Sequence, residues 1–179
     1  MFNTIVIENF FDNFVYLENN FKKIPLVKYD NYPQKYKVTA TEKWPGHRSL
    51  PLQTEHPFLT QLVMKEIMQK SDSENLIHKP WSINASVHLR LDDDNDGDFI
   101  HTDSGDLTMI VFLAKTNLNS GLNLYNIVSD QTTHIKYVQN RAVIFNSRTP
   151  HKSHLNFGDN IDNGRLTLNA FIKFEDILN

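Results

Sequence analysis

The sequence predicts an α+β protein whose core is an antiparallel barrel or a double-sheet jelly roll. Two stretches, 83–91 and 165–174, alternate between apolar and polar residues as half-buried strands do. Between them, residues 107–114 form an almost continuous apolar run, which is typical of a strand in a core. Several shorter strand patterns lie between these stretches, and many short strands in succession are typical of barrels and jelly rolls.

Each further element is predicted from its own pattern. Further strands are expected at 4–7, at 122–125 after the Ser120-Gly121 turn, at 132–137 and at 142–146. An amphipathic helix is expected at about 12–22, and the stretch 31–49, which contains Pro33, Pro45 and Gly46, is expected to be mostly irregular. A second helix, at about 57–70, is expected to pack on the outside of the sheet, because five of its apolar residues fall near helical spacing: Phe58, Leu62, Val63, Ile67 and Met68.

The length and composition indicate one globular domain over residues 1–179, with a supporting part at 1–79 and the jelly-roll core at 80–174. The absence of cysteine excludes disulfides and thiolate metal sites. A net charge of −3 without a dense basic patch does not indicate a nucleic-acid partner. No apolar run reaches membrane-spanning length, and the N-terminal stretch carries Glu8 and Asp12 without a basic flank, unlike a signal peptide. A cytoplasmic protein without a membrane partner is therefore expected.

A candidate metal site is formed by His101-Thr102-Asp103 together with His151. Residues two apart share one face of an extended strand end, so His101 and Asp103 can reach the same ion. His151 follows the strand expected at 142–146, and His154 is the competing choice for this distal ligand. Two imidazoles and one carboxylate can occupy one face of an octahedral metal and leave the other face open. This ligand set is typical of non-haem Fe(II) oxygenases.

An acidic motif overlaps the same region. Residues 92–97, Asp-Asp-Asp-Asn-Asp-Gly, fit the opening of an EF-hand loop, and Asp103 falls at the twelfth position of that loop. An EF-hand needs a helix on each side, whereas both flanks have strand patterns. We therefore expect a solvated loop beside the metal site, with a bound calcium ion as the alternative.

The second half of the chain resembles the 2-oxoglutarate/Fe(II)-dependent dioxygenases, in particular the prolyl-4-hydroxylase-like branch and its small phage and marine bacterial members. The resemblance covers about residues 80–174, and the segment 44–49 (Trp-Pro-Gly-His-Arg-Ser) adds a weaker likeness. It is carried by four motifs: His101-Thr102-Asp103, the Gly121–Tyr125 strand, Phe145-x-Ser147-x-x-x-His151, and Arg165-Leu166-Thr167.

This resemblance implies a double-stranded β-helix core with iron held by His101, Asp103 and His151. It further implies that Arg165, with Thr167, holds the distal carboxylate of 2-oxoglutarate, because a guanidinium can pair with a carboxylate through two parallel hydrogen bonds. His88 and Tyr125 are further candidates for contact with the cosubstrate, although an outward or packing role is open for each. Among the aromatic residues of the stretch 29–44, packing and lining of a substrate channel are both open: Tyr29, Tyr32, Tyr36 and Trp44.

The sequence thus predicts an enzyme that hydroxylates its substrate and couples this reaction to the decarboxylation of 2-oxoglutarate to succinate. Its cofactors would be Fe(II), 2-oxoglutarate and O2, with ascorbate as an optional reductant. A peptidyl proline leads the candidate substrates, and other peptides and small molecules are open. The alternatives are a non-catalytic metal- or ligand-binding jelly roll, an Fe(II) dioxygenase that does not use 2-oxoglutarate, and a calcium-stabilised interaction domain.

Overall fold

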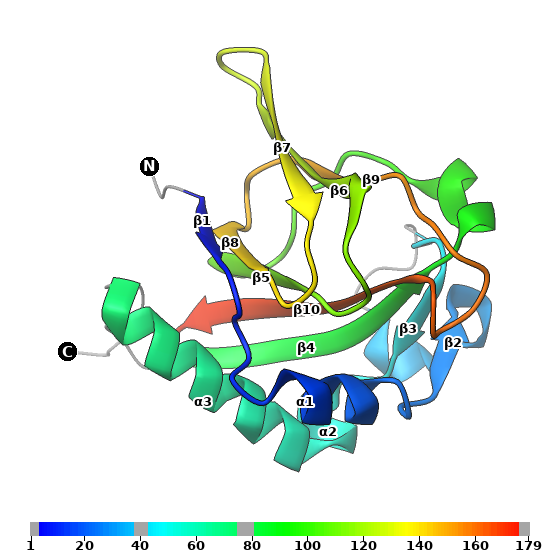
Figure 1. Cartoon of the computed structure of the whole chain (residues 1–179), viewed down its shortest axis with the longest axis vertical. Helices are drawn as coiled ribbons and strands as arrows, with labels where there is room; N and C mark the ends of the chain where they lie inside the picture. Colours follow the sequence, from blue (N-terminus) through cyan, green and yellow to red (C-terminus); the bar gives the residue numbers. More distant parts are fainter. Residues whose placement is uncertain (1–3, 38–42, 75–80, 176–179) are drawn as a thin grey trace.

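The computed structural model of the chain describes residues 4–37, 43–74 and 81–175, and its strands form two antiparallel sheets (Figure 1). The seven strands of the major sheet are, in spatial order, β1 (Ile5–Ile7), β8 (Ala142–Asn146), β5 (Leu107–Phe112), β10 (Arg165–Phe174), β4 (Trp81–Arg90), β3 (His47–Ser49) and β2 (Leu26–Lys28). The minor sheet contains β7 (Gln131–Tyr137), β6 (Asn117–Asn126) and β9 (His151–His154). The predicted jelly-roll core is confirmed.

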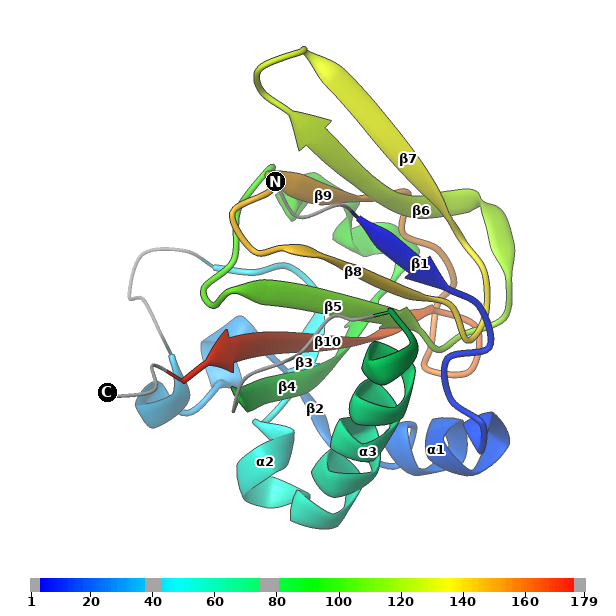
Figure 2. The ribbon, with the colours of Figure 1, turned by 90° about the vertical axis from the view of Figure 1, so that its left-hand side faces the viewer.

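The helices lie on the side of the major sheet opposite to the minor sheet, so the molecule has three layers (Figures 1 and 2). They are α1 (Phe14–Phe21), α2 (Leu52–Glu55) and α3 (Pro57–Glu74), with short 3-10 helices at Tyr29–Asn31, Gln34–Tyr36 and Asp92–Gly97. Among the described residues, no helix is both long enough and apolar enough to cross a membrane.

Strand β10 is the centre of the major sheet. It pairs with β4 over all ten of its residues and with β5 on its other edge. Its bounds and those of β8 agree with the sequence prediction, because their alternation and apolar content are strong and turns end both strands. Alternate residues of β10 point to opposite faces, so Arg165, Thr167 and Asn169 share the face that looks toward the minor sheet, where they line a cavity.

Helix α3 occupies the region predicted for a helix, but its buried face differs from the predicted one. Leu59, Val63 and Ile67, spaced by four residues, are buried against the core. Phe58 and Met68 are 61% and 54% exposed, so their assignment to the packed face was wrong. Pro57 at the first helical position fits this start, since proline lacks only a hydrogen-bond donor that the first turn leaves unused.

The N-terminal part contributes more to the sheet than the sequence predicted. Strands β1, β2 and β3 extend the two edges of the major sheet, and β3 lies within the stretch that we expected to be mostly irregular. Strand β1 was predicted at 4–7, whereas β2 and β3, of three residues each, have no pattern that marks them in the sequence. They form because neighbouring strands pair with them: β3 pairs with both β2 and β4.

Asn140 connects the N-terminal segment to the turn between β7 and β8. Its backbone carbonyl accepts a hydrogen bond from Phe10 N at 2.8 Å. Its side chain accepts from Phe11 N at 2.9 Å and donates to Phe11 O at 3.0 Å. Phe10 and Phe11 are fully buried, and Asn140 has a left-handed φ of 59°, which asparagine tolerates better than most residues.

Replacing Asn140 should therefore weaken the whole domain. Asn140→Gly keeps the left-handed backbone but removes both side-chain hydrogen bonds, so we expect a loss of about 1–3 kcal/mol in the free energy of unfolding. Asn140→Ala should lose roughly 1 kcal/mol more, because alanine is strained at this φ. Urea unfolding followed by circular dichroism measures both variants. A wild-type midpoint for Asn140→Gly would mean that these bonds do not stabilise the fold.

Candidate metal centre

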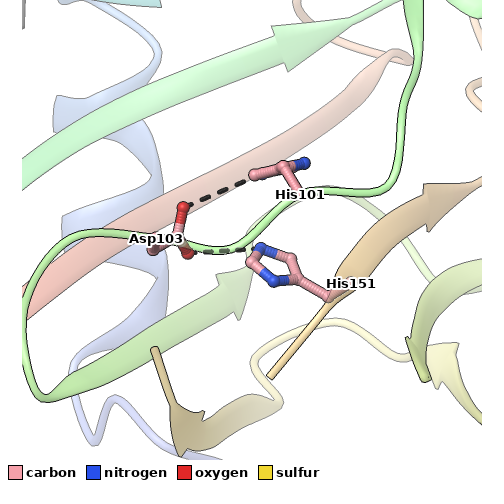
Figure 3. Close-up of side chains that lie close together, drawn as sticks. All are labelled: His101, Asp103 and His151. Atoms are coloured by element: carbon pink, nitrogen blue, oxygen red, sulfur yellow. Dashed lines mark ion pairs between the residues drawn. The ribbon is translucent and has the colours of Figure 1, made fainter. Parts of the chain in front are cut away.

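His101, Asp103 and His151 lie together at the end of the cavity between the sheets (Figure 3). One potential ligand atom from each residue lies within 4.8 Å of the other two. The carboxylate of Asp103 faces both rings: its Oδ2 lies 3.2 Å from His151 Nε2, and its Oδ1 lies 3.8 Å from His101 Nε2. The structure thus brings together the three residues that the sequence singled out as metal ligands.

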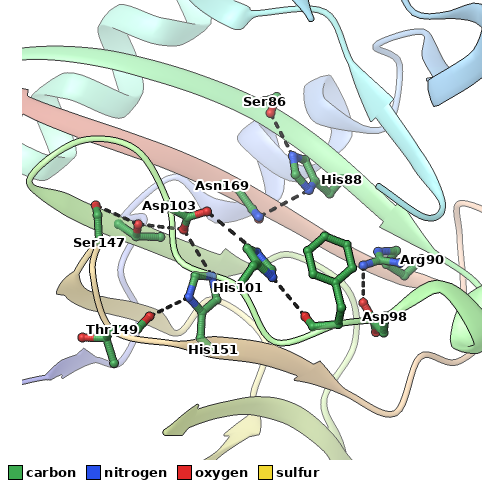
Figure 4. Close-up of polar contacts among 12 residues, drawn as sticks. Ser86, His88, Arg90, Asp98, His101, Asp103, Ser147, Thr149, His151 and Asn169 are labelled. Carbon is green, nitrogen blue, oxygen red and sulfur yellow. Dashed lines mark hydrogen bonds and ion pairs between the residues drawn. The ribbon is translucent and has the colours of Figure 1, made fainter. Parts of the chain in front are cut away.

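The backbone holds both imidazole rings in the same way. Nδ1 of His101 donates to Phe99 O at 3.1 Å, and Nδ1 of His151 donates to Thr149 O at 3.0 Å (Figure 4). In each case the acceptor is the carbonyl two residues before the histidine. A proton on Nδ1 leaves the lone pair of a neutral ring on Nε2, which is the nitrogen that faces Asp103. Both rings are therefore oriented to bind a cation at one shared point.

Backbone pairing places these ligands. His101 and His151 exchange two backbone hydrogen bonds, N to O, of 3.0 and 2.8 Å, as an isolated antiparallel bridge. His151 begins β9, and its Cα partner in β6 is Leu124. Asp103 is fixed by a bond from its own N to Ser147 O at 2.8 Å. The loop before β5 is thus attached to both sheets.

The carboxylate of Asp103 is supported by two hydroxyls that the sequence reasoning did not single out as site residues. Thr108 donates to Asp103 Oδ2 at 2.8 Å, and Thr108 Oγ1 lies 3.0 Å from Ser147 Oγ. Both hydroxyl residues are fully buried. A threonine inside the apolar run of β5 is the signal that could have revealed this role, because a buried hydroxyl needs a partner.

The electrostatics of His101 and Asp103 favour the forms of these two side chains that bind metals. Burial lowers the pKa of His101, and the neighbouring His151 lowers it further. Burial acts to raise the pKa of Asp103, but the hydrogen bond and charge of His151 outweigh it, so this pKa is lowered. Neutral imidazoles and an ionised carboxylate are the ligands that a transition metal needs. The donor set therefore fits a divalent cation.

The cavity beside these residues has a volume of about 310 Å³. Arg165 and Thr167 line it from β10, and both are almost fully buried. Arg165 Nη2 donates to Gly121 O at 3.2 Å, and the guanidinium lies 5.7 Å from the ring centroid of Tyr137. Its Nε is buried without a hydrogen-bond partner among the described residues. Burial lowers the pKa of Arg165 to about 10, which leaves it charged at neutral pH.

His88 also lines the cavity, but hydrogen bonds occupy both of its ring nitrogens (Figure 4). Thr167 donates to Asn169 Oδ1 at 2.8 Å, which turns the Asn169 amide nitrogen toward His88 Nδ1 at 3.3 Å. His88 Nε2 lies 2.9 Å from Ser86 Oγ. Burial lowers the pKa of His88 well below its ordinary value, and three nearby arginines lower it further. His88 is thus a neutral, fixed part of the wall.

Asp98 fixes the chain that leads into His101, and the sequence reasoning missed it. It accepts from Arg90 Nη2 at 2.5 Å, from the hydroxyl of Ser153 and from Asn156 Nδ2 at 3.3 Å. The carboxylate therefore connects β4 with β9 across the mouth of the cavity. The only sequence signal for it was its place in an acidic stretch, which gives no partner.

Two other candidates lie away from the cavity. Tyr125 is not among the residues that line it, because Leu122, which does, points to the opposite face of β6. The structure therefore does not support a cosubstrate contact for Tyr125. His154 is not part of the three-residue cluster: its ring packs against His134 with centroids 4.8 Å apart. His151 and His154 differ by an odd number of residues, so β9 turns them to opposite faces.

The flanks of the acidic motif agree with the sequence expectation. Strand β4 precedes it, β5 is the next element after the His101–Asp103 loop, and the motif itself forms a 3-10 helix. Asp94 Oδ2 accepts a hydrogen bond from Leu91 N at 2.8 Å. The helix–loop–helix arrangement of an EF-hand is therefore absent from the described residues of this region.

The sequence matches no protein-family model, and a comparison with curated proteins gives no match. Solved structures do resemble the chain. A 2OG-Fe(II) oxygenase family oxidoreductase from Burkholderia pseudomallei has a TM-score of 0.66 at 10% identity, covering 95% of this chain and 84% of that one. A Pseudomonas putida prolyl-4-hydroxylase gives 0.62 at 12%, with 96% and 92% covered. HygX from Streptomyces hygroscopicus, with nickel and 2-oxoglutarate bound, gives 0.67 at 8%, with 97% and 83% covered. The chain therefore has the fold of the 2-oxoglutarate/Fe(II) oxygenases.

The ligand assignment can be tested by substitution. His101→Ala, Asp103→Ala and His151→Ala should each abolish tight Fe(II) binding, because each removes one of three protein ligands. His154→Ala should bind Fe(II) as the wild type does, and it serves as the matched control. Anaerobic calorimetry measures the affinities. An empty site in His154→Ala together with a filled one in His151→Ala would reverse the assignment.

The buried neutral His88 should make the fold sensitive to acid. Its pKa is lowered in the folded state, so the unfolded chain binds the extra proton, and stability should fall as pH drops below the ordinary value of about 6.5. One such proton contributes a slope of at most about 1.4 kcal/mol per pH unit. His88→Asn should show a smaller slope than the wild type between pH 6.5 and 5. Urea unfolding at several pH values measures this, and equal slopes would contradict the assignment.

Proposed function

We propose that this chain is a non-haem Fe(II) oxygenase that uses 2-oxoglutarate and O2 to hydroxylate a substrate. The observation that carries the proposal is the convergence of two sites in one cavity. At one position, two imidazoles and a carboxylate face a shared point. At another, the buried guanidinium of Arg165 has an unpaired donor. The fold shared with the 2-oxoglutarate/Fe(II) oxygenases supports the same reading.

The residues fit iron. His101 Nε2, His151 Nε2 and a carboxylate oxygen of Asp103 would hold it, since the carbonyls of Phe99 and Thr149 fix the required tautomers. Three protein ligands leave the remaining positions of an octahedral ion for the cosubstrate and O2. When bound, iron and 2-oxoglutarate supply the oxidising chemistry, in which the keto acid loses CO2 and becomes succinate.

The residues also fit a dicarboxylate. One end of 2-oxoglutarate would bind at the metal, so the other carboxylate would need a cation inside the cavity to neutralise it. Arg165 is 4% exposed and offers a rigid fork of donors, which matches a carboxylate better than a point charge does. The hydroxyl of Thr167 donates to Asn169 in the present arrangement and would have to turn to contact the carboxylate.

In the proposed reaction, the protein's own residues hold the metal ligands in place and exclude water from the cavity. The backbone bridge between His101 and His151 fixes the spacing of the ligands. Thr108 keeps the Asp103 carboxylate oriented by donating a hydrogen bond to it. Apolar side chains of the lining, such as Ile110, Leu122 and Phe171, restrict water around the reacting groups.

The substrate is an organic molecule with a C–H bond that can reach the open side of the metal site. A peptidyl proline is a first choice for testing, because a Pseudomonas putida prolyl-4-hydroxylase shares the fold. Other peptides and small molecules belong in the same screen. A turnover screen with Fe(II), ascorbate and 2-oxoglutarate, reading succinate against candidate substrates, tests this part of the proposal.

The cosubstrate assignment has a direct test. Arg165→Ala should weaken 2-oxoglutarate binding about ten- to hundredfold, since a charge-assisted pair contributes roughly 1.5–3 kcal/mol. Arg165→Lys should recover only part of this affinity, because the ammonium lacks the bidentate fork. The visible absorbance of the iron–keto acid chelate, titrated anaerobically, measures the affinity.

Iron affinity is the internal control, and it should be unchanged in both variants. The absence of a chelate band in the wild type would leave a metal-binding jelly roll or an Fe(II) dioxygenase that does not use 2-oxoglutarate. A band with the same affinity in Arg165→Ala would remove Arg165 from the cosubstrate site.

A further inference from the structure

Three arginines line the cavity, and the proposed function accounts for two of them. Arg90 is paired with Asp98, and Arg165 is assigned to the distal carboxylate of 2-oxoglutarate. Asp98 and Asp103 are the carboxylates among the described residues that line the cavity, and Asp103 is a candidate metal ligand. Arg48 therefore forms no ion pair with the described part of the lining, although the charge of Asp103 acts to raise its pKa.

Aromatic packing fixes the position of Arg48. Its guanidinium carbon lies 4.1 Å from the ring centroid of Trp44. Trp44 in turn meets Tyr29 and Tyr32 edge to face, with centroids 4.6 and 4.8 Å apart. The cation is thus held on a rigid aromatic cluster at the wall formed by β3. Because its orientation is fixed in advance, little conformational freedom would be lost when it binds a partner.

This end of the cavity also has unused hydrogen-bond donors. Arg48 Nε and Trp44 Nε1 are both buried without a partner among the residues that the structure describes. Burial lowers the pKa of Arg48 to about 10, so it carries its charge at neutral pH. Buried donors without a partner destabilise a fold. An anion bound at this point would accept hydrogen bonds from these donors and neutralise the charge of Arg48.

An anion bound at Arg48 would occupy a different position from a carboxylate bound at Arg165. Arg48 lies on β3 and its Cα partner is His88 of β4, whose other Cα partner is Thr167 of β10. Strand β4, with the neutral His88, thus lies between β3, which carries Arg48, and β10, which carries Arg165. Arg165 lies instead against Gly121 O and the ring of Tyr137, next to the minor sheet.

We propose that Arg48 binds a carboxylate of the substrate, so that the enzyme acts on a carboxylic acid. This inference rests on the proposed function and narrows its substrate class, because an internal peptidyl proline has no carboxylate to offer. The cavity of about 310 Å³ is at the lower end of the range for ligand sites, which favours a small acid or the end of a peptide.

The lining further disfavours a free ammonium group. Among the described residues, both carboxylates that line the cavity already have charged or polar partners: Asp98 pairs with Arg90, and Asp103 lies against the two histidines. A zwitterionic amino acid would find no carboxylate for its ammonium. The site therefore fits acids without one: N-acylated amino acids, aliphatic or hydroxy acids, or the C-terminal carboxylate of a peptide.

Binding, measured without turnover, tests the inference. The protein is loaded with Zn(II), which has no redox chemistry, and with 2-oxoglutarate. The probes are N-acetyl amino acids and their primary amides, which differ by one charge, together with one peptide that has either a free or an amidated C-terminus. Calorimetry should give at least one acid that binds ten- to hundredfold more tightly than its amide. The peptide pair separates free acids from peptide ends.

The variants connect this preference to Arg48. Arg48→Gln should remove the tenfold to hundredfold advantage of the acid and leave the amide almost unchanged, and Arg48→Lys should retain part of it. The matched control is Arg148→Gln, which removes the same charge from an exposed position outside the cavity and should keep the full preference.

Two results would overturn the proposal: no acid in the panel binds the wild type better than its amide, or the preference survives in Arg48→Gln. Loss of 2-oxoglutarate affinity in Arg48→Gln would also overturn it, by making Arg48 a cosubstrate anchor. Failure of the proposed function has a different signature, since 2-oxoglutarate would then not bind the wild type at all. The acid–amide comparison on the protein loaded with metal alone would still decide the role of Arg48.

Discussion

The backbone bridge between His101 and His151 is the constraint on which the site depends. Two hydrogen bonds tie the loop before β5 to the first residue of β9. Asp103 follows two residues later, and its backbone N donates to Ser147 O. The carboxylate is therefore placed beside both imidazoles by backbone hydrogen bonds, without any contribution from the ligand side chains. This backbone pairing does not depend on the side chains of His101, Asp103 and His151, so substituting one of them should leave the loop in place. The fold therefore sets the position of the site, and the three side chains set its affinity for a cation.

Arginine nitrogens that are buried without a hydrogen-bond partner have a cost in stability that the rest of the molecule must offset. Arg48 and Arg165 each have one such nitrogen, Nε, in the described chain. The offset comes from a continuous apolar core that includes residues of both sheets and of the helices α1 and α3. The polar groups near His88 avoid this cost, because Ser86, His88, Asn169 and Thr167 satisfy one another in a single chain of hydrogen bonds.

The sequence predicted the strong strands, the short strand β1 and the candidate metal ligands, but not the short strands β2 and β3. Strands β8 and β10 were predicted with their observed bounds because their own residues determine them, and His101-x-Asp103 is visible because the two ligands are neighbours in the chain. Strands β2 and β3 have three residues each and depend on pairing, which no local pattern reveals. The role of Asp98 was missed for the same reason, because its partners are up to 58 residues away in the chain: Arg90, Ser153 and Asn156. For Tyr125 the sequence left both a cosubstrate contact and a packing role open, because it gives the period of a strand but not which face is inside; Tyr125 is not among the residues that line the cavity.

Gly46 allows residues that are distant in the chain, Arg90 and Asp98 among them, to pack together beside the candidate metal site. It precedes β3 with a φ of 77°, and a Cβ there would come within 2.5 Å of Arg90 Cδ and of Leu89 O. The glycine thus gives the side chain of Arg90 the space in which it reaches Asp98. Asp98 in turn holds the segment that ends in His101, while Trp44 and Arg48, on either side of Gly46 in the chain, form the opposite wall. The segment 44–49 therefore contributes both to the placement of the candidate metal ligands and to the cation that faces the substrate, which explains why a short, mostly irregular stretch carries so many side chains of this cavity.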